Sequence, residues 1–189
     1  VNTQINQYRI ATNTFEQKYN QLPGDMTNAS SYWPSCIDNG TNTCNGDGDS
    51  TVTNTGSENT RFWQHLSLAE IIKGTYDGSQ VTSPLEDTYP FLLNNRLTTI
   101  YNSSYSDKTD TTIAVNKHGF LQKFGLTELD ESVMMLLDTK FDDGLPESGT
   151  TRLHPDGSLS GCLTNTSPAD YDYSASGDYS TCYPSFLWN

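Results

Sequence analysis

Large side chains recur along the first two dozen residues at alternating steps of four and three. The stripe consists of Val1, Ile5, Tyr8, Thr12, Phe15 and Tyr19. Such steps place side chains on one face of an α-helix, and the residues between them are mainly polar. The first Gly or Pro is found at Pro23-Gly24, a dipeptide typical of turns. The pattern predicts an amphipathic helix over 1–22, roughly 30 Å long, whose stripe other residues must cover.

Two further stretches have helical patterns, and a polar loop precedes them. Residues 23–60 are nearly free of aliphatic side chains and predict a long loop. Residues 58–73 predict a second helix that Gly74 ends, or two short helices with a break near Ser67, where a capping-box pattern occurs. Residues 128–138 predict a third helix.

The second half of the chain favours β-strands. Runs at 97–101 and 111–115 are rich in β-branched residues, and runs at 150–153 and 158–163 flank a turn sequence, so each pair predicts a hairpin. A last strand is predicted at 184–188. The fold class expected is α+β: a long N-terminal helix packed on an antiparallel sheet of three to five strands, with long loops and short second and third helices. We expect a single domain over 1–189, in which 1–22 is the helix, 23–60 a loop and 61–189 the remainder.

Charge and composition narrow the possible partners. The net charge is −13, and such a surface repels nucleic acid and anionic lipid. We therefore expect no nucleic-acid partner. Only 17% of residues are charged, whereas Ser, Thr, Asn and Gly are abundant, which is typical of an extracellular protein.

The chain has four cysteines, and none has the spacing of a metal site. Pairing neighbours in sequence gives two disulfides, Cys36–Cys44 and Cys162–Cys182, and indicates an oxidising compartment. The alternative is four reduced, buried thiols.

An acidic motif in the first loop suggests a cation site. Asn45, Asp47 and Asp49 place oxygen atoms at every second position, with Gly between them. Ca²⁺ prefers such oxygen ligands, and Glu58 at the start of the next helix could complete the set. The motif does not have the full EF-hand pattern. The alternative is a loop of Asx-turns without an ion.

A second acidic cluster, Asp138, Asp142 and Asp143, lies at the predicted C-terminal end of the third helix. Carboxylates at that end oppose the helix dipole unless a positive charge compensates. Lys140, Arg152 or Ca²⁺ could supply the charge. The alternatives are therefore a second Ca²⁺ site and a salt-bridged or capped turn.

The sequence does not point to catalysis. It has neither the nucleophile-elbow nor the zinc-protease motif, and no Cys/His pair typical of nucleophilic catalysis. His65 is interpreted as a half-buried packing residue, and His118 and His154 fall in a predicted loop and turn. We expect a protein that is not an enzyme, with no catalytic residues.

Several motifs occur together in one order along the chain. They are a helix end F-x-x-K-Y-x-x-L-P-G-D, an N-A pair with an aromatic-Trp pair, an N-G-D-G-D loop, W-Q-H-L, an acidic stretch from Asp138 to Gly149 and a C-terminal Cys pair around a loop. The residues of the first, second and fourth are Phe15, Lys18, Tyr19, Leu22, Pro23, Gly24, Asp25, Asn28, Ala29, Tyr32, Trp33, Trp63, Gln64, His65 and Leu66. In this combination the chain resembles type IV pilin-like proteins, which include type II secretion pseudopilins and related prepilins.

The resemblance implies a non-catalytic subunit of a helical filament. It implies a membrane anchor through the apolar first half of the helix, copies of the same chain and other pilins as partners, and a bacterial cell-envelope location, periplasmic or in an extracellular filament. Major pseudopilins of this kind bind Ca²⁺ in a loop. The apolar run that begins such proteins is missing here, and we expect it to precede Val1 in the natural protein.

A second hypothesis belongs to another class. The tyrosines near the C-terminus, Tyr171, Tyr173, Tyr179 and Tyr183, could stack on sugars. Together with the acidic loops they would suit a secreted or pilus-tip adhesin that binds glycans in a Ca²⁺-dependent way.

Overall fold

The structure is a computed structural model of the chain. It describes residues 2–36, 43–50, 52, 57–78, 91–92, 95–96, 118–121, 131–145, 149, 151–153 and 184–188. The chain divides into two compact units. The first is Val1–Leu93 with Thr98–Ser103, and the second is Asn94–Leu97 with Ser104–Asn189.

The first helix, α1, spans Asn2–Tyr19. It ends three residues earlier than the sequence predicts, and the reason is local. Asn20 has a positive φ of 53°, the left-handed conformation that Asn tolerates better than most residues. Its backbone N–H still donates to the carbonyl of Glu16 at 2.7 Å, which completes the last turn.

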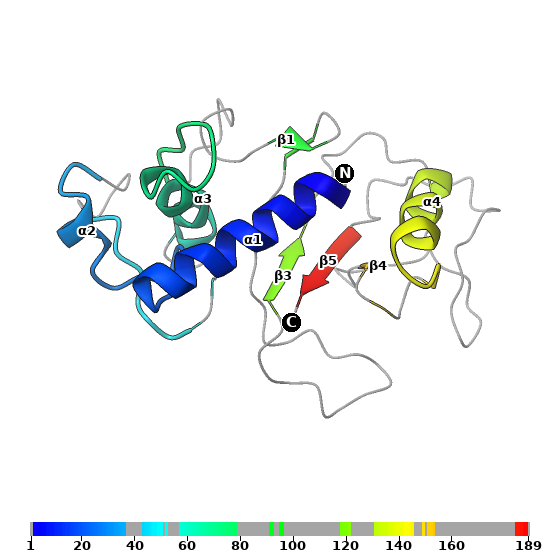
Figure 1. Ribbon diagram of the computed structural model, residues 1–189, viewed down its shortest axis with the longest axis horizontal. Coiled ribbons are helices and arrows are strands. Elements are labelled where there is room, and N and C mark those ends of the chain that lie inside the picture. The colour runs from blue at the N-terminus through cyan, green and yellow to red at the C-terminus, as the bar shows by residue number, and fades with distance from the viewer. Residues whose placement is uncertain are drawn as a thin grey trace. The chain divides into compact units, whose positions relative to one another are not determined.

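The stripe of α1 is covered by the helix α3, which spans Glu58–Leu68 (Figure 1). Phe15 is fully buried, and its ring stacks on that of His65 at 6.1 Å between centroids. Tyr8 meets Trp63 edge to face at 5.0 Å. Aromatic pairs in this geometry add stability beyond the area they bury. In the described residues, α1 and α3 therefore form a helix pair.

This arrangement contradicts the predicted fold class. The expectation was a long N-terminal helix on an antiparallel sheet of three to five strands, but the helix packs on α3. The described residues are mainly helical, and their strands are only two to five residues long. The error has a physical source. The aromatic face of α3, with Phe62, Trp63 and Leu66 buried, supplies the apolar cover that the sequence pattern predicts for a sheet.

A short helix that the sequence did not predict, α2, spans Ala29–Tyr32 within the predicted loop. The helix α3 ends at Leu68, close to the break predicted near Ser67 and well before Gly74. Thr60 Oγ1 and Gln64 Nε2 donate to the carbonyls of Gly78 and Asp77, each at 2.7 Å. These bonds hold the segment that follows α3 against the helix.

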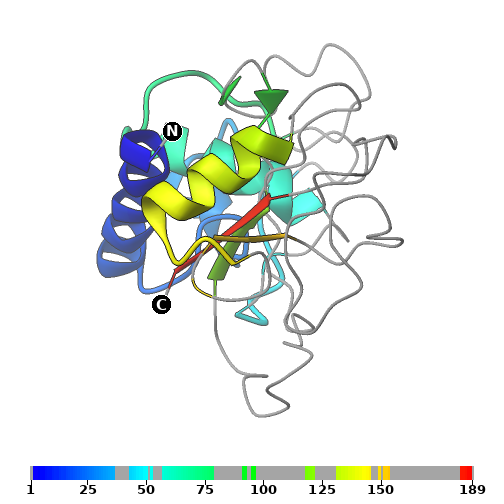
Figure 2. The same ribbon diagram turned by 90° about the vertical axis from the view of Figure 1, so that its right-hand side faces the viewer.

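The second unit has one described helix, α4, which spans Glu131–Phe141, about three residues later than predicted. Its strands are β2 (Asn95–Arg96), β3 (His118–Leu121), β4 (Thr151–Leu153) and β5 (Pro184–Trp188), and β1 (Phe91–Leu92) belongs to the first unit. The strand β5 pairs antiparallel with β3 on one side and β4 on the other (Figure 2).

The register opposes Phe120 to Phe186 and Arg152 to Ser185. Thus β4 pairs with the last strand. The predicted hairpin at 97–101 and 111–115 and the predicted strand at 158–163 lie outside the described residues.

No described helix has the length and apolar character that crossing a membrane requires.

Candidate functional site

The turn after α1 packs directly on α3. Leu22 and Asp25 are buried, and Gly24 has a φ of +89°, a conformation that favours glycine. A Cβ at this position would also collide with the carbonyl oxygen of Glu58 and press on the backbone of Phe62. Gly24 therefore allows the turn to approach the first turns of α3.

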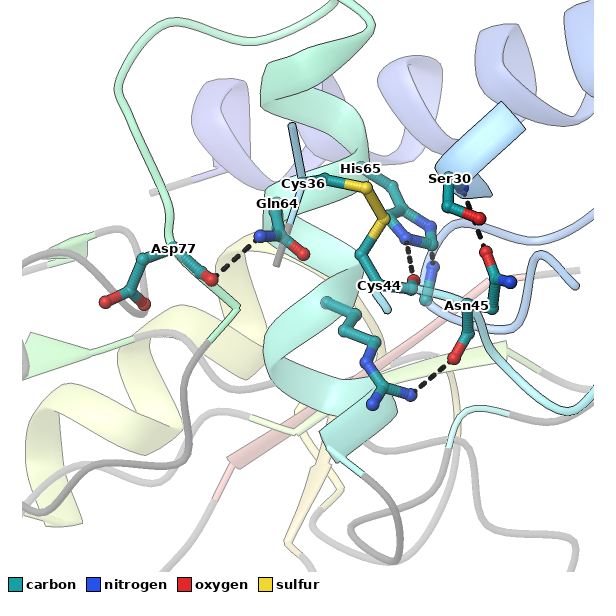
Figure 3. The surroundings of a disulfide bond; sticks show 9 residues. Ser30, Cys36, Cys44, Asn45, Gln64, His65 and Asp77 are labelled. Atoms are coloured by element: carbon teal, nitrogen blue, oxygen red, sulfur yellow. Dashed lines mark hydrogen bonds between the residues drawn. A yellow bond between two sulfur atoms is a disulfide. The ribbon is translucent and has the colours of Figure 1, made fainter. Parts of the chain in front are cut away.

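His65 joins this turn to the loop that follows the first disulfide. Its Nδ1 accepts a hydrogen bond from the backbone N–H of Gly24, and its Nε2 lies against the carbonyl oxygen of Cys44, both at 2.8 Å (Figure 3). An acceptor at Nδ1 and a donor at Nε2 define the neutral tautomer with the proton on Nε2. The expectation of a half-buried packing residue was wrong, because the ring is fully buried and both nitrogens are used.

Burial lowers the pKa of His65 to about 4, because a charged imidazolium loses its hydration inside the protein. The positive charge of Arg61 contributes to this lowering of the pKa, while the hydrogen bond to Cys44 acts in the opposite direction. The residue is therefore neutral near pH 7 and serves as a connection between two backbone groups.

The predicted Cys36–Cys44 disulfide is present, with its Cα atoms 5.7 Å apart and both residues buried. It closes the loop whose end contacts His65 (Figure 3). The other predicted disulfide, Cys162–Cys182, lies outside the described residues.

The residues just after Cys44 attach to three other segments. Asn45 Oδ1 accepts from the backbone N–H of Ser30 at 2.9 Å, and the Asn45 carbonyl accepts from Arg61 Nη1 at 2.6 Å (Figure 3). The N–H of Gly46 donates to the carbonyl of Met26 at 2.8 Å. A Cβ at Gly46 would overlap the backbone of Asp25. The two glycine-containing motifs of the sequence, around Gly24 and Gly46, are thus packed against each other.

Asp25 binds the acidic loop from the inside. Its Oδ1 accepts from the backbone N–H groups of Gly48 at 2.6 Å and Asp49 at 3.1 Å, and its Oδ2 accepts from Ser50 at 3.0 Å. Only 4% of its surface is exposed. The pKa of Asp25 is raised to about 6, mainly by desolvation and also by the negative charges of Glu58 and Asp49, while the hydrogen bonds from Gly48 and Ser50 act in the opposite direction.

Three carboxylates converge at this loop. Oxygen atoms of Asp25, Asp47 and Asp49 lie within 4.8 Å of one another. Asp47 and Asp49 were predicted as ligands, whereas Asp25 was not. Glu58 is 2% exposed and accepts from the N–H of Asp47 at 3.2 Å, so it lies beside the cluster. Asn45, also predicted as a ligand, directs its side-chain oxygen to Ser30 instead.

The same loop also contains an Asx-turn, the alternative to an ion site that the sequence allows. Asp47 Oδ1 accepts from the N–H of Asp49, two residues on, at 3.1 Å, which is an Asx-turn. Convergent oxygens suit a hard cation such as Ca²⁺, but the Asx-turn forms without one.

The second acidic cluster brings together the three residues predicted for it. Oxygen atoms of Asp138, Asp142 and Asp143 lie within 4.8 Å of one another at the end of α4. Each accepts a backbone N–H from a nearby residue: Asp138 from Gly144 at 3.2 Å, Asp142 from Thr151 at 2.6 Å, and Asp143 from Leu145 at 2.9 Å. The Lys140 ammonium, one of the expected compensating charges, lies 6.0 Å from the ring centroid of Phe141.

Sequence reasoning missed the roles of Asp25 and His65. Both residues belong to recognised motifs, but their partners are between 21 and 41 positions away along the chain. A buried Asp that follows a glycine turn leaves no local periodic signal in the sequence. The chain matches no protein-family model, no curated protein and no solved structure.

Proposed function

We propose that this chain is a non-catalytic structural subunit of a type IV pilus-like filament or a type II secretion pseudopilus. One observation carries the proposal. The motif residues on which the resemblance rests contact one another around the end of α1, although they are far apart in sequence. Gly24 bonds to His65 of the Glu58–Leu68 helix and packs against the backbone of Glu58 and Phe62 in the same helix. The motifs therefore behave as one structural unit.

The chemistry of that unit favours a structural role over catalysis. His65 is neutral, fully buried and bonded to backbone through both nitrogens, so it is not positioned to exchange protons with a substrate. Asp25 uses both oxygens on backbone N–H groups. Side chains that bind the protein's own backbone in this way fix the conformation of loops.

The assembly and its location follow from the same proposal. Copies of the chain and other pilins or pseudopilins would be the partners in the filament. An apolar helical segment upstream of α1 would anchor the subunit in the inner membrane before assembly. The protein would then reside in the bacterial cell envelope, in the periplasm or in an extracellular filament.

Ca²⁺ is part of the proposal as an ion that holds the acidic loop. The ligands would be Asp25, Asp47 and Asp49, with Glu58 beside them, because their oxygens converge at a loop that already follows a tight path. The second cluster, Asp138, Asp142 and Asp143, is the other candidate, because its oxygens also converge within 4.8 Å.

The test is to locate the protein in cells that express the natural full-length gene. We expect antibodies against this domain to label sheared filaments along their length in immunogold electron microscopy. A strain that lacks the gene is the control. Label confined to filament tips, together with EDTA-sensitive binding on a glycan array, would favour the adhesin hypothesis. Protein found only free in the medium would contradict the filament proposal.

A further inference from the structure

His65 connects three parts of the first unit. It belongs to α3, and its ring binds the turn after α1 through Gly24 and the disulfide loop through Cys44. The rings of Phe15 and Trp33 lie 6.1 Å and 5.9 Å from the imidazole, so α1 and the segment after α2 cover it as well. A change in the protonation state of this ring therefore alters its contacts with all of these segments.

The two hydrogen bonds require opposite roles from the two ring nitrogens. Nε2 donates to a carbonyl oxygen, and this bond survives protonation because both nitrogens of an imidazolium are donors. Nδ1 accepts from the N–H of Gly24, and this bond does not survive. After protonation two N–H groups would face each other at a distance of 2.8 Å. Protonation thus opposes one specific contact, between α3 and the turn.

The charged groups around the ring come from several elements. On α3 itself are Arg61, whose charge disfavours an imidazolium, and Glu58, one helical turn before it. The turn carries Asp25, and the loop after Cys44 carries Asp47 and Asp49. On α1, Glu16 is the charged neighbour of Phe15. The atoms that contact the ring nitrogens, however, are backbone atoms of Gly24 and Cys44.

We propose that protonation of His65 releases the Gly24 turn from α3 in mild acid while α1 and α3 remain folded, so that this contact is an acid-sensitive connection within the unit. This inference does not depend on the filament proposal. It rests on the full burial of the ring, on its fixed tautomer and on the loss of the Nδ1 acceptor. Once the turn is released, the ring reaches water and can bind its proton there.

The size of the effect follows from linkage. The ring binds a proton with a pKa of about 4 in the closed state, and with the ordinary value of 6.5 in the open state. The ratio of open to closed turns therefore rises as pH falls through 6.5 and levels off near 4. The total change from well above pH 6.5 to well below pH 4 is up to about 300-fold.

The experiment measures hydrogen exchange of backbone amides by NMR on the full 189-residue chain, corrected at each pH for intrinsic exchange. We expect the protection factor of the Gly24 amide to fall by up to about 100-fold between pH 7 and pH 4. The Ala11 amide, inside α1, is the control and should lose much less. In His65→Gln, whose amide keeps a non-titrating acceptor and donor, the Gly24 loss should disappear.

Equal losses at Gly24 and Ala11 would overturn the proposal, because they would indicate global unfolding. A His65→Gln protein that keeps the full Gly24 loss would overturn it too. If His65→Gln does not fold, the wild-type chain decides. The ¹⁵N signals of the His65 ring must then titrate with the same midpoint as the Gly24 loss, and a His65 ring that titrates near 6.5 rejects the proposal.

Discussion

The two acidic clusters use the same side chains in different ways. In the first, Asp25 binds backbone N–H groups that are 23 to 25 residues away, so the carboxylate joins segments that the chain brings together only on folding. In the second, the three Asp side chains bind N–H groups two to nine residues away. The first cluster is a tertiary connection, whereas the second is a local helix-end turn. Composition alone does not distinguish them.

The largest loss of stability should come from substituting Asp25, the carboxylate that joins segments distant in sequence. Asp25→Ala leaves three N–H groups without their acceptor, and hydrogen bonds to carboxylates are stronger than those between neutral groups. We expect a loss of about 3 kcal/mol in the free energy of unfolding, measured with urea. The matched variant Asp143→Ala, at an exposed local turn, should lose less than about 1 kcal/mol. Equal losses would remove the distinction between the clusters.

Ca²⁺ should separate the clusters in a second way. At 100 times its dissociation constant, a bound ion adds about 2.7 kcal/mol to the free energy of unfolding. We expect thermal unfolding of the wild type to shift upward with Ca²⁺ relative to EDTA. The double variant Asp47→Asn/Asp49→Asn should abolish that shift.

The matched variant Asp142→Asn/Asp143→Asn should keep most of the stabilisation by Ca²⁺. If the second pair abolishes the shift instead, the ion binds the local cluster and our assignment is wrong. If Ca²⁺ has no effect on the wild type, neither cluster is a Ca²⁺ site under these conditions.

The disulfide Cys36–Cys44 should contribute slightly less to the free energy of unfolding than a bound Ca²⁺ ion does. Cys36–Cys44 closes a short loop with a sequence separation of 8, for which the chain-entropy model gives about 2.5 kcal/mol. The variant Cys36→Ser/Cys44→Ser should lose that amount in urea unfolding. Because Cys44 also presents its carbonyl to His65, we expect the amides of residues 43–50 to lose protection more than those of α4. Uniform loss along the chain would contradict a local role.

The smallest effect concerns pH. The pKa of Asp25 is raised in the folded state to about 6, against an ordinary 3.8, so the folded chain binds the extra proton between these values. The contribution of Asp25 to stability therefore grows as pH falls from 6 toward 3.8. His65 has the opposite sign, because its folded pKa is depressed, and it destabilises the fold as pH falls below 6.5.

The variant Asp25→Asn isolates the pH-dependent contribution of Asp25 to stability. In chelator, the stability of wild type minus that of Asp25→Asn should increase between pH 7 and pH 4, by about 2 kcal/mol. Urea unfolding at a series of pH values measures this difference. A constant or decreasing difference would show that the Asp25 pKa is not raised.

These clusters also show which features the sequence could predict. The three carboxylates of the local cluster lie together as predicted, because they fall within one short stretch at the end of α4, whereas Ca²⁺ binding there stays a prediction. The stripe of α1 was likewise predicted from local spacing. The element that covers this stripe was not predicted. A helix and a sheet can both supply an apolar face, and the local sequence does not show which of them packs on α1. His65 and Asp25 were missed since their partners are remote.

The packing around Gly46 has a chemical consequence. Asn-Gly is the dipeptide in which the glycine nitrogen most readily attacks the Asn side chain, forming a succinimide and converting Asn to Asp or isoaspartate. In this protein the Gly46 nitrogen is turned toward the carbonyl of Met26, and the Asn45 side chain is held by Ser30. The attacking and attacked groups are thus each occupied elsewhere. We expect Asn45 to deamidate slowly while the loop stays docked.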